Sequence, residues 1–168
     1  MTLLAAFAIT ATAAQINNGA WLIGASSNMA ANNYTSKTSA DVFTFNLNIQ
    51  GGNFIIDNLV LGLNTGFTSL SQGGSNQAQT TLGIFSRYYF PKNFFAGAGV
   101  NSYWFSNNSG NSESHAEVRL EAGYAAFISN SCAIEPSISY RGVTDPNYTG
   151  RISSLSFNLG FMIYLHRK

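Results

Sequence analysis

The chain has 168 residues, which suits a single domain. Only 9% of the residues are charged, against roughly 25% in ordinary soluble proteins. The net charge of +1, without a basic run interleaved with aromatics, gives no indication of nucleic acid as a partner. The single cysteine, Cys132, excludes an internal disulfide, and no second cysteine or nearby histidine offers a metal or redox pair, so we expect no cofactor.

The N-terminal residues 1–14 form an apolar run of signal-peptide length that closes on small residues. Cleavage is expected after Ala13 or Ala14. The run lacks the usual basic start, which leaves open a start further upstream. No later segment reaches the ~18–20 apolar residues that a transmembrane helix needs. We therefore expect residues 15–168 to form one domain, and any integral crossing of a membrane to use strands.

Eight strand-like segments follow, as judged by alternating hydrophobicity and turn residues. Longer polar connections follow the first, third, fifth and seventh segments, and shorter ones follow the second, fourth and sixth. The first short connection is expected to lie behind a bulge at Gly51 and Gly52. Long loops at one end and short turns at the other are typical of bacterial outer-membrane barrels. The expected strands are 19–29, 41–50, 58–70, 80–90, 94–106, 116–129, 133–144 and 151–165.

The last segment shows the alternation most clearly, because every second residue from Leu155 to Leu165 is large and apolar. Such a strand has two unlike faces. The pattern alone leaves open whether the apolar face points into a soluble barrel or outward to lipid.

The charged residues decide between these alternatives. Six of them lie inside strands, always on the face opposite the bulky apolar residues. A lipocalin-like soluble carrier would turn these charges outward and would need charges on most strands, but five of the eight carry none in their middles. We therefore predict an all-β, eight-stranded antiparallel up-and-down transmembrane barrel with a polar lumen. The residues of the predicted lumen polar network, in which arginines and carboxylates can pair, are Arg87, Glu117, Arg119, Glu121, Glu135 and Arg141.

Aromatic residues near the strand ends, on the apolar face, predict two girdles at the membrane interfaces. The apolar residues between them would contact outer-membrane lipid. One feature does not fit this pattern, because Pro136 removes a ladder hydrogen bond inside the seventh strand. The predicted girdle residues are Trp21, Tyr88, Phe90 and Phe94 on the turn side, and Phe43, Phe67 and Trp104 on the loop side.

The signal, the eight alternating segments, "FIIDNLVLGLNTGF" across the first short turn and "LGFMIYL" at the end resemble the small porin-like outer-membrane barrels of the OmpX and OmpA transmembrane-domain kind. The resemblance implies the outer membrane of a Gram-negative bacterium, with lipid and lipopolysaccharide around the barrel. It also implies insertion by the barrel-assembly machinery, which reads a signal in the last strand. The family ends on an aromatic residue, whereas this chain ends "LHRK". The residues that match the signal are Asn158, Gly160, Ile163 and Leu165.

Three functions remain open for such a barrel. The first is a non-enzymatic structural or surface-interaction role through the extracellular loops, which are rich in Asn, Ser and Gly. The second is a narrow pore, since inner-face glycines leave room for water, although paired Arg and Glu side chains would block it. The third is a lipid-modifying enzyme that uses His115 with a serine and a glutamate of "SESH" (112–115) at the loop rim. We expect the first.

Overall fold

The computed structural model describes residues 16–31, 42–72, 75–106, 112–144 and 152–165. Strands make up most of this part of the chain, and the 3-10 turn η1 (Pro91–Asn93) is the one helical element among the described residues. No helix in these ranges is long and apolar enough to cross a membrane. The strands are β1 (Trp21–Ala31), β2 (Val42–Ile56), β3 (Leu59–Gln72), β4 (Ser75–Tyr89), β5 (Phe94–Ser106), β6 (Ser112–Tyr124), β7 (Ala126–Phe127), β8 (Cys132–Thr144) and β9 (Ile152–Leu165).

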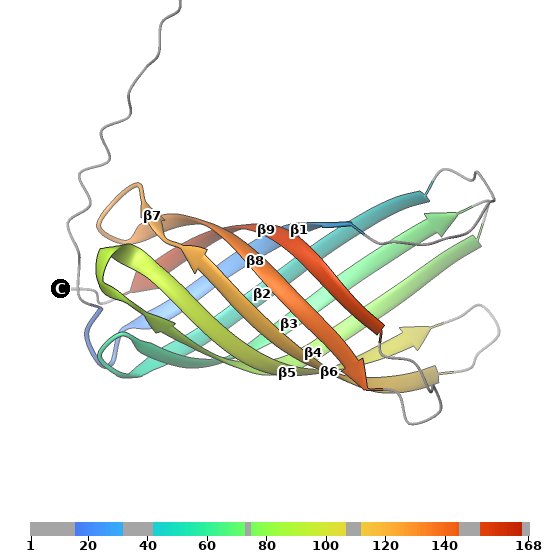
Figure 1. The fold of residues 1–168 in the computed structure, drawn as a ribbon, viewed down its shortest axis with the longest axis horizontal. Coiled ribbons are helices and arrows are strands. Elements are labelled where there is room, and N and C mark those ends of the chain that lie inside the picture. The colour runs from blue at the N-terminus through green and yellow to red at the C-terminus, as the bar shows by residue number, and fades with distance from the viewer. Residues whose placement is uncertain (1–15, 32–41, 73–74, 107–111, 145–151, 166–168) are drawn as a thin grey trace, which may run out of the picture.

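The strands close into an antiparallel up-and-down barrel (Figure 1), which confirms the predicted fold. Strands β1 to β6 pair each with the next, β6 and β7 both pair with β8, β8 pairs with β9, and β1 pairs with β9 from Trp21↔Leu165 to Ala31↔Leu155. The short β7 continues β6, since both pair with β8 in one register. The barrel is therefore eight-stranded, with β6 and β7 as one interrupted strand, and closure leaves its sheet without an open edge.

The interruption between β6 and β7 lies opposite Pro136. The register runs from Gly123↔Ser137 to Ala126↔Ile134, so Tyr124 and Ala125, unpaired toward β8, lie opposite Pro136 and Glu135. Proline has no N–H to donate to the ladder. On its other side Pro136 stays paired, with Leu159 of β9. The proline therefore interrupts the pairing of β8 with β6 and leaves its pairing with β9 in place.

The short turns differ from the prediction at the first hairpin. β2 runs straight through Gly51 and Gly52, which pair with Leu63 and Gly62 of β3, so the predicted bulge there is wrong. The register shifts instead between Phe54 and Ile56, next to the turn. Asn58 in that turn has a φ of 65°, a conformation that asparagine tolerates better than most residues.

Two polar connections are shorter than predicted. β3 and β4 extend to Gln72 and Ser75, and β6 begins at Ser112 rather than at residue 116. These extensions are rich in Ser, Asn and Gln and carry no apolar alternation. They are strands nevertheless, because the hydrogen bonds between neighbouring strands join backbone N–H and C=O groups and do not depend on the side chains.

The outer wall is apolar, as the sequence predicts, and the lumen is polar except at its turn-side end. On β9 the exposed fractions are 60% for Leu155 and 55% for Leu159, while Ser156 is buried at 2%. An exposed apolar band around a closed barrel is what a lipid solvent requires. Six predicted girdle residues are exposed on the outside, and the side chain of Phe43 lies outside the described ones; the six are Trp21, Phe67, Tyr88, Phe90, Phe94 and Trp104.

Candidate functional site in the barrel lumen

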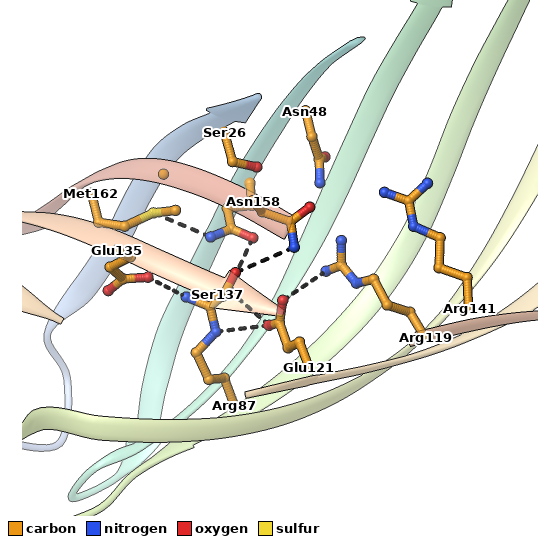
Figure 2. Close-up of a pocket in the computed structure, with 12 residues that line it drawn as sticks. Ser26, Asn48, Arg87, Arg119, Glu121, Glu135, Ser137, Arg141, Asn158 and Met162 are labelled. Atoms are coloured by element: carbon orange, nitrogen blue, oxygen red, sulfur yellow. Dashed lines mark hydrogen bonds and ion pairs between the residues drawn. The ribbon is translucent and has the colours of Figure 1, made fainter. Parts of the chain in front are cut away.

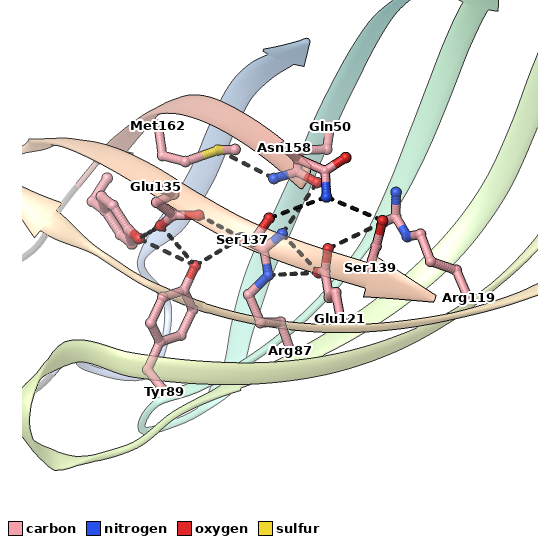
Figure 3. Close-up of polar contacts among 11 residues, drawn as sticks. Gln50, Arg87, Tyr89, Arg119, Glu121, Glu135, Ser137, Ser139, Asn158 and Met162 are labelled. Atoms are coloured by element: carbon pink, nitrogen blue, oxygen red, sulfur yellow. Dashed lines mark hydrogen bonds and ion pairs between the residues drawn. The ribbon is translucent and has the colours of Figure 1, made fainter. Parts of the chain in front are cut away.

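Arg87 of β4 is the centre of the polar network in the lumen (Figure 3). Its Nη2 lies 2.7 Å from Glu121 Oε1, and its Nη1 lies 2.7 Å from Glu135 Oε2. Nε donates to the same Glu121 oxygen at 2.9 Å. The guanidinium also lies over the ring of Phe95, with 4.3 Å from Cζ to the centroid. One buried cation is thus satisfied by two carboxylates and an aromatic face.

Glu135 of β8 is held from its other side by two tyrosines. The hydroxyl of Tyr164 donates to Glu135 Oε1, and the hydroxyl of Tyr89 donates to the same oxygen at 3.2 Å. The two hydroxyls lie 3.1 Å apart. A buried charge is tolerated when it is paired and hydrogen-bonded, and Glu135 meets both conditions.

A second polar tier lies nearer the loops. Asn101 of β5 links two neighbours, since it donates to Glu117 Oε1 at 2.9 Å and accepts from Asn64 at 3.0 Å. Across the lumen, Asn158 of β9 donates to the hydroxyl of Ser139 at 3.0 Å. These contacts are mostly neutral and single, so this tier is more weakly held than the one around Arg87.

Arg119 and Arg141 lie opposite each other on β6 and β8. Arg119 reaches Glu121 Oε2 at 3.9 Å, beyond hydrogen-bond distance. Arg141 belongs to none of the ion pairs formed within the described part of the chain, and its buried Nε has no hydrogen-bond partner there. The two guanidinium groups line one small cavity of about 20 Å³ (Figure 2).

The turn-side end of the lumen is apolar. Side chains from the turn-side ends of several strands meet there, and Phe54 and Tyr89 pack with ring centroids 5.8 Å apart. Tyr164 lies 6.3 Å from Phe54 by the same measure. The buried apolar residues of this cluster, which we call the turn-side plug, are Ile16, Ala20, Leu22, Phe54, Val60, Phe85, Tyr89, Phe95, Ala125, Ala133, Met162 and Tyr164.

The segment before β1 covers this plug. Ile16 is 1% exposed, and its backbone N–H donates to Asn58 Oδ1 at 3.0 Å. Asn58 returns a bond from its own N–H to the Ile16 carbonyl at 2.9 Å. Asn18 adds a bond from its N–H to Asp57 Oδ1 at 2.8 Å. Residues 16–20 thus seal the turn-side end against the first hairpin.

The lumen glycines hold side chains rather than water. A Cβ on Gly62 would lie 2.7 Å from Phe85 Cε1, and one on Gly123 would lie 2.5 Å from Phe95 Cζ. A Cβ on Gly83 would come within 2.0 Å of Asn101 Oδ1. These glycines admit neighbouring side chains to the lumen, so the expected room for water is occupied.

The plug is what the sequence reasoning missed. Tyr89 has the same strand parity as Arg87, and Tyr164 the same parity as Asn158 and Gly160, so alternation already assigned both tyrosines to the lumen. The sequence analysis does not name the two tyrosines, because it expects only small polar and charged residues on the inner face of the strands. A count of bulky residues on both parities at the turn-side ends would have found them.

The six predicted lumen residues all face the interior, but they pair unevenly. Arg87, Glu121 and Glu135 form one ion cluster, whereas Glu117 binds Asn101. The charges point inward, so the lipocalin-like alternative is wrong.

His115 lies within β6 rather than at a loop rim, opposite Tyr103, with ring centroids 5.4 Å apart. The side chains of its predicted partners, residues 112–114, lie outside the described ones.

The residues of the expected assembly signal lie toward the end of β9. Gly160 is buried on the lumen side, and Leu165 is exposed on the wall. Their role stays a prediction, as does the signal peptide, since residues 1–15 lie outside the described part of the chain.

Solved structures of known proteins share this fold. Neisserial surface protein A matches with a TM-score of 0.63 and 13% identity, over 86% of this chain and 96% of that one. The N-terminal β-barrel domain of Pseudomonas aeruginosa OprF matches with a TM-score of 0.55 and 13% identity, over 88% of this chain and 98% of that one. No protein-family model and no curated protein matches the sequence. The likeness shows the fold, and at that level the resemblance to small outer-membrane barrels is confirmed.

Proposed function

We propose that the protein is an integral barrel of the outer membrane of a Gram-negative bacterium. Its short turns would face the periplasm, and its longer loops would act at the cell surface. The apolar wall supports a position in the membrane, because contact between such a large apolar surface and water is unfavourable. The fold supports the choice of membrane, since closed barrels of this size are typical of bacterial outer membranes.

The filled lumen is the observation that best supports a barrel that does not conduct solutes. A pore needs a continuous water path, but the turn-side plug and residues 16–20 close one end. The Arg87 cluster fills the next level, and the cavity that it lines together with Arg119 and Arg141 is about 20 Å³, room for roughly one water. We therefore favour a structural or surface-interaction role over passage of solutes.

The partners that follow are those of an assembled outer-membrane barrel. Lipid and lipopolysaccharide would surround the exposed wall. The barrel-assembly machinery would read the last strand through Asn158, Gly160, Ile163 and Leu165. We propose neither a cofactor nor an enzymatic activity.

Planar-bilayer recording tests the closed lumen. Refolded protein should give no discrete conductance steps, while a general porin inserted under the same conditions should give them. Heat-modifiable mobility on an SDS gel would show beforehand that the sample is folded. Discrete steps from the folded protein would instead make it a narrow pore.

Surface labelling tests the orientation. A membrane-impermeant amine reagent applied to intact cells should modify Lys37, in the first long connection, and should spare Lys92, in the short turn η1. Both lysines should react after the outer membrane is permeabilised. Labelling of Lys92 alone on intact cells would reverse the proposed orientation.

A loop replacement tests the surface role. Residues 107–111 can be replaced by a two-residue Asn-Gly turn, which joins antiparallel strands directly. The variant should keep its heat-modifiable fold, while adhesion of the expressing cells to cultured epithelial cells should fall. Unchanged adhesion would count against this loop as the contact surface.

A further inference from the structure

The arginine pair of the lumen is only weakly compensated, since its carboxylate contact among the described residues is the long one from Arg119 to Glu121 at 3.9 Å. Arg119 and Arg141 are register partners on adjacent strands, and both side chains reach the same cavity (Figure 2). Like charges placed opposite each other in a sheet destabilise it. Arg119 is only 8% exposed at its side chain, so little water screens its guanidinium, whereas Arg141 is half-buried. An anion in the cavity would offset the repulsion that Glu121 leaves.

The carboxylates of the lumen are engaged elsewhere. Glu135 is bound by Arg87 and two tyrosine hydroxyls, and Glu121 by Arg87 at 2.7 Å. Glu117 accepts from Asn101. Glu121 approaches the pair no closer than 3.9 Å, at Arg119. The cavity is lined by the Arg87 cluster, which brings one cation and two anions, and by the two further arginines, so its charged lining carries a net positive charge.

The cavity also offers neutral donors. Ser26 of β1 and Asn48 of β2 line it opposite the arginines. Arg141 Nε is a buried donor without a hydrogen-bond partner among the described residues, and an anion could accept from it. Such an orphaned donor requires an explanation, and a bound water or ion is the usual one. A volume of about 20 Å³ admits one water or one monatomic ion and excludes phosphate or an organic acid.

We propose that this cavity binds one monatomic anion of the halide class, with chloride as the abundant candidate. The anion would accept hydrogen bonds from Arg119 and Arg141 and neutralise part of their charge. The hydroxyl of Ser26 and the amide of Asn48 would complete the shell. The site would tie β6 and β8 to β1 and β2 across the lumen, above the Arg87 cluster.

Unfolding in matched salts tests the site. The refolded full chain is unfolded by urea in sodium chloride and in sodium gluconate of the same ionic strength, since gluconate is too large for the cavity. At chloride ten times its dissociation constant, the unfolding equilibrium constant should be about tenfold lower than in gluconate. Arg141→Gln should abolish this dependence, and Lys92→Gln, at the exposed turn, should keep it.

The sign of the Arg141→Gln effect separates binding from a merely structural role. In gluconate the substitution relieves the repulsion, so the variant should be at least as stable as the parent. A purely structural arginine would make the variant less stable by the same factor in both salts, which would overturn the proposal.

Bromide provides a test that needs no variant. Crystals of the parent protein grown in sodium bromide should show an anomalous peak between Arg119 and Arg141. A cavity without that peak, or equal stability of the parent in chloride and gluconate, would mean that water fills the site and would refute the proposal.

Discussion

The two ends of the lumen are built by different chemistry. At the turn side, aromatic rings and the Arg87 cluster fill the space, and buried charges meet partners at 2.7 Å. Toward the loop side the amide and hydroxyl contacts are single, Arg141 forms no ion pair with a described residue, and a cavity reaches from Arg141 to the Arg87 cluster. The contrast indicates that the packing at the turn side stabilises the barrel, while the cavity beside Arg141 has room for the proposed anion.

This division fits the position of the chain ends. Both described ends of the chain lie at the turn side, where residues 16–20 bind the first hairpin and β9 pairs with the start of β1 (Figure 1). Closing a barrel requires the first and last strands to meet. Tight packing beside this seam therefore stabilises the step on which closure depends.

Arg87→Met should have the largest effect. The change leaves Glu121 and Glu135 buried without their cation, which costs about 3–5 kcal/mol of unfolding free energy. Urea unfolding in detergent micelles, followed by tryptophan fluorescence, measures it. Arg141→Met, on the loop side, removes no ion pair with a described residue and should cost far less. Equal losses for the two variants would end the distinction between the halves.

Leu159→Arg should come next, because it tests the wall rather than the lumen. Leu159 lies midway along β9 and is 55% exposed on the outer face. An arginine at mid-depth in lipid costs about 2–4 kcal/mol. Ser153→Arg, on the same face near the loop end, is the matched control and should cost little. Unfolding from lipid vesicles compares the two, and a tolerated Leu159→Arg would argue against a lipid-facing wall.

Gly62→Ala should destabilise the turn side by about 1–3 kcal/mol through overpacking. Its Cβ would lie 2.3 Å from the Gly51 carbonyl oxygen and 2.7 Å from Phe85 Cε1. Gly51→Ala is the control, since its nearest neighbour would be a carbonyl oxygen at 3.9 Å. Urea midpoints should fall for Gly62→Ala and stay unchanged for Gly51→Ala. The reverse order would contradict the packing described for Phe85.

Thr68→Val should have the smallest effect, as a probe of the loop side. It removes one hydrogen bond, from the Thr68 hydroxyl to Asn46 Oδ1 at 2.7 Å, with an expected cost of about 0.5–1.5 kcal/mol. Thr80→Val, exposed on the outer face of β4, should be neutral in the same unfolding assay. A loss as large as that of Arg87→Met would show the loop side to be equally important.

Alternation and charge placement together predicted most of the fold. The segment from Leu155 to Leu165 was assigned the correct outer face, and the six mid-strand charges were assigned to the lumen. Strand ends were less predictable. Residues 75–79 and 112–115 carry no apolar alternation, yet pairing with β3 and β5 keeps them in strands. Ladder bonds form between backbones, so they leave no trace in the side-chain pattern.

The sequence by itself determined which side chains face inward, because a strand alternates its faces with period two. The tertiary structure alone decided which of them meet. Arg87 and Glu135 are 48 residues apart in the sequence, and the register and tilt of the strands bring them together. The same register sets Arg119 opposite Arg141 and stacks the tyrosines into the turn-side plug. Period is a local property of the chain, whereas register exists only once the barrel has closed.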